Sequence, residues 1–126
     1  MSEMKEYVSR IEEMGSVHIS EDVVSSIAAV SAVEVEGVSS LAANLGSDIA
    51  GLLSTKKNLA KGVRLQMEEE GVVVDMAVLV KYGYAIQDVA KAIQDAVISG
   101  VEAMTGLHVA AVNVNVAGIA FGKLDR

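Results

Sequence analysis

The sequence predicts an α+β fold, namely a two-layer α/β sandwich in which a small mixed β-sheet carries two helices on one face. Three patterns lead to this prediction. Residues 62–82 alternate as a β-hairpin does, residues 86–104 have the spacing of an amphipathic helix, and residues 112–116 alternate again as a strand. A helix between two strands is most economically a crossover connection, so the last strand is expected to run parallel to the second hairpin strand.

Length and composition indicate a single domain. A chain of 126 residues is long enough to bury a hydrophobic core without disulfides or a structural metal. It contains no cysteine, which excludes disulfides and thiol chemistry. We expect a loosely ordered segment over residues 1–15, one domain over residues 16–122 and a tail over residues 123–126.

The part of the chain before the hairpin is expected to contribute one helix and two short strands. Residues 4–14 place apolar side chains at helical spacing, but a single helix of this length is marginal in water without packing. After a very short strand, Ser20 is the expected N-cap of the first helix, because its hydroxyl can accept a hydrogen bond from the first turn. Gly37 should end that helix, residues 38–42 form a strand, and residues 44–61 a long mobile loop.

The hairpin pattern has one apolar face, which continues on both sides of a two-residue turn at residues 70–71: Val63, Leu65, Met67, Val72, Val74, Met76, Val78 and Val80. This turn places Gln66 opposite Asp75, with Arg64 diagonally near. Asp75 is expected to be structural, because a lone carboxylate on a strand has no second group for acid–base catalysis.

The second helix has a continuous apolar stripe that must lie on the hairpin: Ile86, Val89, Ala90, Ile93, Val97, Val101 and Met104. Gly106 supplies a residue able to adopt the left-handed conformation that commonly ends a helix. The start of the helix is less well marked. Gly83 or Ala85 would have to serve as N-cap, and alanine forgoes about 1 kcal/mol that a serine, threonine, aspartate or asparagine cap would contribute.

Several short runs occur in a specific order: Ile19-Ser20-Glu21-Asp22-Val23-Val24, Gly37-Val38, Lys61-Gly62-Val63, Val80-Lys81-Tyr82-Gly83, Asp88-Val89-Ala90, Thr105-Gly106-Leu107 and residues 112–116. Together they resemble the alkaline shock protein family, the small envelope stress response proteins of Gram-positive bacteria, long described as a domain of unknown function. The resemblance covers roughly residues 16–118. Glu36 and Ala85 depart from the family pattern, which often has proline and serine there. The resemblance implies a non-enzymatic cytoplasmic protein of cell-envelope homeostasis that acts through self-assembly and partner proteins.

Basic residues around the loop are the first candidates for an interaction surface. Lys56, Lys57, Lys61 and Arg64 bring four of the ten basic residues into and just past one glycine-bearing loop. The simpler interpretation is a solvated loop. The functional interpretation is contact with a phosphate, a lipid headgroup or an acidic partner.

The last strand supplies the second group of candidates. Asn113 and Asn115 are expected on the sheet face away from the helices. With Val109, Ala111 and Ala117 they would form a flat, weakly polar surface suited to a partner.

The sequence carries no pattern typical of a catalytic, cofactor or metal site. Residues 46–51 have the glycine spacing of a phosphate-binding loop, but Leu52 and Leu53 stand where lysine and a hydroxyl residue are needed. His18 and His108 have no ligand spacing around them. We therefore predict no catalytic residue, no cofactor and no metal, and we do not expect an enzyme.

The sequence thus favours a cytoplasmic scaffold or interaction protein that associates with itself. Because the later apolar runs are too short to span a bilayer, any membrane proximity would come through a membrane-anchored partner protein. The alternative is a nucleic-acid-associated module, since helices on one face of a small sheet also describe several RNA-binding folds. A net charge of -7 and an aromatic content of 3% work against nucleic-acid binding.

Overall fold

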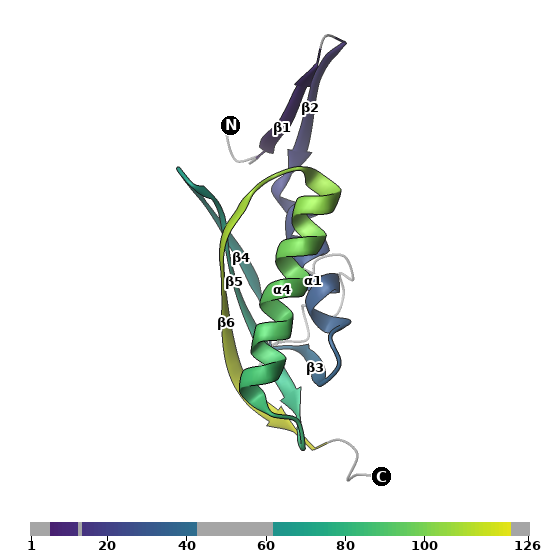
Figure 1. Cartoon of the computed structure of the whole chain (residues 1–126), viewed down its shortest axis with the longest axis vertical. Coiled ribbons are helices and arrows are strands. Elements are labelled where there is room, and N and C mark those ends of the chain that lie inside the picture. The colour runs from purple at the N-terminus through teal and green to yellow at the C-terminus, as the bar shows by residue number, and fades with distance from the viewer. Residues whose placement is uncertain (1–5, 13, 43–61, 122–126) are drawn as a thin grey trace, which may run out of the picture.

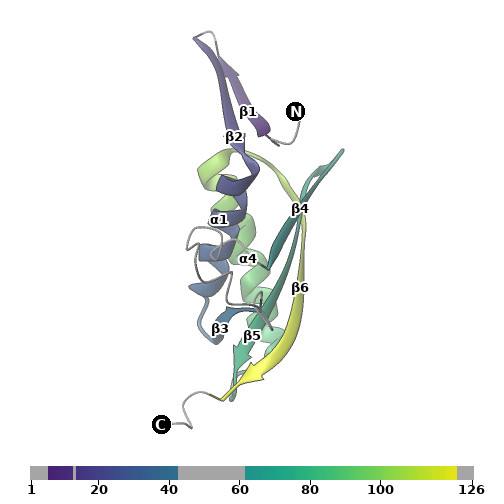
Figure 2. The same ribbon diagram turned by 180° about the vertical axis from the view of Figure 1, so that it is seen from behind.

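The computed structural model describes residues 6–12, 14–42 and 62–121, and these fold around a two-layer core (Figure 1). One layer is a four-stranded mixed sheet, and both views place helices α1 and α4 on the same side of it (Figures 1 and 2). The elements are β1 Glu6–Glu12, β2 Gly15–Ser20, α1 Glu21–Val33, β3 Val38–Leu41, β4 Val63–Glu68, β5 Gly71–Lys81, α4 Ile86–Thr105 and β6 Val109–Ala120. The predicted two-layer α+β sandwich is confirmed.

Strand β5 is the centre of the sheet. On one side β6 runs parallel to it, as predicted, and on the other β4 and β3 run antiparallel to successive parts of it. Alternate residues of β5 are buried under the helices: Val72, Val74, Met76, Val78 and Val80. The same hydrophobic cluster contains the buried stripes of both helices: Val24, Ala28, Ala32, Val89, Ile93, Val97 and Val101. The core therefore lies between one face of the sheet and the helix layer.

The hairpin of β4 and β5 turns at residues 69–70, one residue earlier than the sequence predicts. Arg64 consequently lies directly opposite Asp75, so the prediction that Gln66 occupies this position is wrong. The register differs from the predicted one by two residues. Such a slip keeps every side chain on its predicted face, because strand side chains alternate with a period of two.

Gly71, which was expected in the turn, is instead the first residue of β5 and has a φ of 140°. A Cβ atom at this position would lie 2.5 Å from the backbone oxygen of His108. Glycine is therefore needed here both for the backbone conformation and for the close approach of the segment that leads into β6.

Three of the four helix ends use the predicted residues. Ser20 is the N-cap of α1, and its Oγ accepts a hydrogen bond from the backbone N–H of Val23 at 3.3 Å. Ala85 is the N-cap of α4 and makes no side-chain capping bond. Gly106 ends α4 in the left-handed conformation with a φ of 81°. The prediction that Gly37 ends α1 is wrong, because α1 ends at Val33 with Glu34 as its C-cap and Gly37 lies in the turn that follows.

The residues before α1 form a second hairpin. Strands β1 and β2 pair antiparallel as a separate two-stranded sheet, which extends beyond the ends of the two helices (Figure 1). The helical spacing of residues 4–14 therefore does not make residues 6–12 a helix. A strand pairing satisfies the backbone groups of this short segment, whereas an unpacked helix of the same length would be marginal.

Candidate interaction surface

The sheet face opposite the helices, which we call the open face, is the candidate interaction surface. In both views no described part of the chain lies over it (Figures 1 and 2). Its side chains come from three strands: Arg64, Gln66 and Glu68 of β4, Val73, Asp75, Ala77 and Leu79 of β5, and Ala111, Asn113 and Asn115 of β6. Ala117 of β6 is exposed too, but it is an extra residue where the register shifts again, opposite Val78 and Leu79. A flat surface that combines polar and apolar side chains is typical of contact with another protein and not of a catalytic site.

One polar row crosses the open face. Arg64, Asp75 and Asn113 are neighbours in register across β4, β5 and β6. The Asn113 Nδ2 donates a hydrogen bond to the Asp75 Oδ1 at 2.7 Å. This bond joins the central strand to β6 on the solvent side and gives Asp75 a structural partner.

Apolar residues flank this polar row. Val73, Ala77 and Leu79 are half-buried, although they point away from the helices. Leu79 also lies close to Gly118 of β6, where an added Cβ would come within 3.2 Å of the Leu79 Cδ2. Sequence reasoning missed Val73 and Leu79 as surface residues because they sit within an almost continuous apolar run, and only their odd numbering in β5 distinguishes them.

The predicted interaction residues Arg64, Asn113 and Asn115 are exposed and lie on the open face. The other basic candidates, Lys56, Lys57 and Lys61, lie outside the described residues, as does the expected loop over residues 44–61. Whether any of these residues contacts a partner stays a prediction.

The predicted place of Val109 on the open face is wrong. Its side chain is only 4% exposed and belongs to the hydrophobic cluster under the helices. The register of β6 shifts opposite Val72 and Val73, where Ala110 is an extra residue. Such a bulge resets the alternation, so Val109 and Val112 both face the helices.

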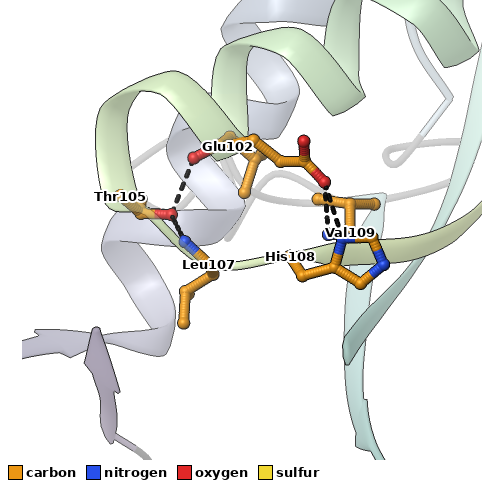
Figure 3. Close-up of polar contacts among 6 residues, drawn as sticks. Glu102, Thr105, Leu107, His108 and Val109 are labelled. Carbon is orange, nitrogen blue, oxygen red and sulfur yellow. Dashed lines mark hydrogen bonds and ion pairs between the residues drawn. The ribbon is translucent and has the colours of Figure 1, made fainter. Parts of the chain in front are cut away.

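The end of α4 fixes where β6 begins (Figure 3). The Glu102 Oε2 accepts a hydrogen bond from the backbone N–H of Val109 at 2.9 Å and lies 3.0 Å from the His108 Nδ1. The Thr105 Oγ1 accepts a hydrogen bond from the backbone N–H of Leu107 at 3.0 Å. The end of α4 thereby fixes the position of the first residues of β6, the strand that carries the predicted interaction residues Asn113 and Asn115.

Neither histidine stands in a metal-like cluster. His108 pairs with Glu102, and the His18 Nε2 lies 3.0 Å from the Ser16 Oγ. Among the side chains that the structure describes, those of residues 14–42 and 62–121, no three histidine, aspartate or glutamate groups come close enough to hold a metal ion. The absence of a metal or cofactor from the whole protein stays a prediction.

Two further surface features escaped sequence reasoning. Tyr82 and Phe121 are 69% and 50% exposed where β5 and β6 end, with their ring centroids 5.1 Å apart. A groove between the helices is lined by Ser31, Glu34, Val35, Ala96, Ser99 and Gly100. The exposed aromatic residues follow directly after strand patterns, which is the signal that could have placed them at the end of the sheet.

Comparison with protein families matches residues 9–121 to the alkaline shock protein 23 family, which has a cell envelope-related function. The chain belongs to this family. The match spans almost every described element and confirms the resemblance seen in the sequence. The function of the family, as far as it is described, is related to the cell envelope.

The relatives are themselves uncharacterized proteins of Gram-positive bacteria. The chain is 37% identical to Spy1535 of Streptococcus pyogenes over 116 residues, which is 91% of this chain and 87% of the relative. It is 30% identical to YqhY of Bacillus subtilis over 108 residues, 86% of this chain and 79% of the relative. It is 33% identical to YloU of the same organism over 106 residues, 83% of this chain and 88% of the relative. The comparison with solved structures finds no match.

Neither α1 nor α4, the helices in the described ranges, is both long and apolar enough to cross a membrane.

Proposed function

We propose that this protein is a non-enzymatic scaffold of the cell envelope that acts by associating with itself and with a partner protein. The observation that carries this proposal is the open face, on which both polar and half-buried apolar side chains lie with no described element over them. Surfaces that combine apolar patches with a polar surround are typical of protein–protein contacts.

The proposal places the protein on the cytoplasmic side of the envelope, next to a membrane-anchored partner. Support comes from the envelope-related function of the family. In the nucleic-acid alternative, RNA-binding sheets stack bases on aromatic side chains. None of the open-face residues from β4, β5 and β6 is aromatic, and Asp75 lies at the centre of that face. The net charge of -7 also opposes binding to phosphates.

The first test measures the mass of the purified wild-type protein by sedimentation equilibrium over a wide concentration range. A scaffold should form dimers or larger assemblies, and crosslinking in Gram-positive cells should join the protein to a membrane-anchored protein. A strictly monomeric protein that crosslinks to no partner would overturn the proposal.

The second test adds charge to the open face. Asn113→Lys combined with Asn115→Lys alters two exposed residues there, and we expect a folded protein that has lost its assemblies or its crosslinked partner. Val109 is unsuitable for this purpose, because a lysine there would enter the core. The matched control is Gln87→Lys with Ala103→Lys, which adds the same charge to exposed positions of α4. Equal loss in the control would show that charge alone, and not the open face, matters.

A further inference from the structure

The sequence of β6 is nearly the same read in either direction from Val114. Asparagine stands one residue away on both sides, valine two away, alanine three away, and alanine or glycine four away. Five residues away the pair is valine and isoleucine. None of the twelve residues of β6 carries a charge, although charged residues make up 21% of the whole chain.

The outer edge of β6 presents backbone groups that β5 does not use. At the two ends of the strand pair, the N–H groups of Val72 and Tyr82 donate to the backbone oxygens of His108 and Ala120 at 2.9 and 3.0 Å. The even-numbered residues of β5 therefore point their backbone groups toward β6. In a parallel pair such a residue bonds to the two neighbours of the residue opposite it. Val112 lies opposite Val74, so Val74 bonds to Ala111 and Asn113.

It follows that Asn113 and Asn115 direct their backbone groups toward β5, while Val112, Val114 and Val116 direct theirs outward. One contact supports this assignment independently. The side-chain Nε2 of Gln94 reaches from α4 to donate to the backbone oxygen of Val112 at 3.0 Å. Beyond that contact, the described residues offer no backbone partner to the outward edge of Val114 and Val116.

We propose that this edge pairs antiparallel with β6 of a second copy of the chain, around a two-fold axis at Val114. The inference rests on the proposed function, since it names the partner and the joint of the self-association. A two-fold interface places the same patch of both copies together, so a strand that reads alike in both directions matches every residue with its like. Val114 would face Val114 of the second copy, and Asn113 would face Asn115.

Side-chain chemistry supports the same pairing. Asn113 and Asn115 lie on the open face, and each amide can both donate and accept a hydrogen bond with the amide opposite it. Val114 and Val116, half-buried on the helix side, would face valines of the second copy. An uncharged edge also lets two copies, each with a net charge of -7, meet without placing like charges in contact.

The backbone bond made by Gln94 is compatible with this joint. A carbonyl oxygen has two lone pairs, so the Val112 oxygen can accept from Gln94 and from the strand of a second copy. The pair would join the two four-stranded sheets into one continuous sheet, with the open faces of both copies on the same side.

The test uses the absence of native cysteine. In the proposed register, residue 113 of one copy and residue 115 of the other form a pair that is not hydrogen-bonded, with Cα atoms about 4.5 Å apart. That separation fits a disulfide, whereas identical residues lie diagonally, at about 7–8 Å. We therefore mix Asn113→Cys protein with Asn115→Cys protein, one of them tagged, and oxidise the mixture.

The expected result is a crosslinked heterodimer in several-fold excess over the homodimer of either variant alone, because only the pair of residues 113 and 115 has a Cα separation that a disulfide spans. The control mixes Asn115→Cys with Gln87→Cys, which places the second thiol at an exposed position of α4. Circular dichroism establishes that each variant is folded. Equal crosslinking in the control mixture, or none in the 113 and 115 mixture, would overturn the β6 joint.

Sedimentation of the wild-type protein separates the two proposals. Assemblies without the 113 and 115 crosslink would leave the scaffold standing and remove only this joint. A protein that stays monomeric at every concentration would remove the joint, and with it the self-association on which the joint rests.

Discussion

The two faces of strand β5 have opposite environments although their residues alternate along one segment. On the covered face, Val72, Val74, Val78 and Val80 are each 0% exposed. On the open face the intervening residues are only half-buried and include a carboxylate. The difference shows that the helix layer, and not the intrinsic preference of the strand, decides which residues stabilise the fold and which remain available to a partner.

This contrast arises because the described residues form only two helices, which cover only one face of the sheet. Helices α1 and α4 both lie on one side, and their buried residues are mostly valine and alanine. The fold consequently buries one sheet face well and leaves the other to solvent or to another molecule. Changes on the covered face should therefore alter folding, and changes on the open face should alter association.

The largest effect is expected from Ile93→Ala in α4. Ile93 is 0% exposed and lies in the middle of the hydrophobic cluster, so its truncation should lower the free energy of unfolding by about 2–5 kcal/mol. The matched control is Ile98→Ala, the same change at a partly buried position of the same helix, with a smaller expected loss. Urea unfolding at one fixed protein concentration measures both. A loss below about 1 kcal/mol for Ile93→Ala would mean that the covered face is not the core.

A middle-sized effect should appear when the same change is made on each face of β5. Val74→Thr places a hydroxyl in a fully buried site and should cost about 1–3 kcal/mol, because no partner is ready for it. Val73→Thr, one residue earlier and on the open face, should stay within about 0.5 kcal/mol of the wild type. Urea unfolding again gives both values. Equal costs at the two positions would abolish the contrast between the faces.

Much of the fold was predictable because it depends on local patterns. The N-cap at Ser20, the left-handed Gly106 and the parallel last strand all follow from residue type and spacing, and the structure has each of them. The hairpin register was not predictable in the same way. Turns at residues 69–70 and 70–71 both keep the apolar face intact, so alternation alone does not distinguish them.

The candidate surface was predictable only in part. Asn113 and Asn115 reach the open face because they alternate with valines that are covered or half-covered. Val109 does not, because a bulge at Ala110 reverses the alternation, and no residue type in this run of small apolar side chains marks a bulge. The placement of Leu79 depends equally on long-range packing, since only the observed sheet shows which side of β5 the helices cover.

The smallest effect on stability is expected on the open face itself. Asn113→Ala removes the hydrogen bond to Asp75, whose donor and acceptor are 2.7 Å apart and exposed. Water can replace an exposed bond of this kind, so the loss should stay below about 1 kcal/mol. Asn115→Ala is the matched control: a neighbouring asparagine on the same strand and face, for which the described residues supply no side-chain partner. Its unfolding free energy should equal that of the wild type within about 0.5 kcal/mol.

Because both asparagines lie in the proposed β6 joint, both variants should weaken association about equally in sedimentation experiments despite their different bonds within one copy. If Asn113→Ala instead cost as much as Val74→Thr, the open face would contribute to the core, and the two faces of β5 would no longer have separate roles.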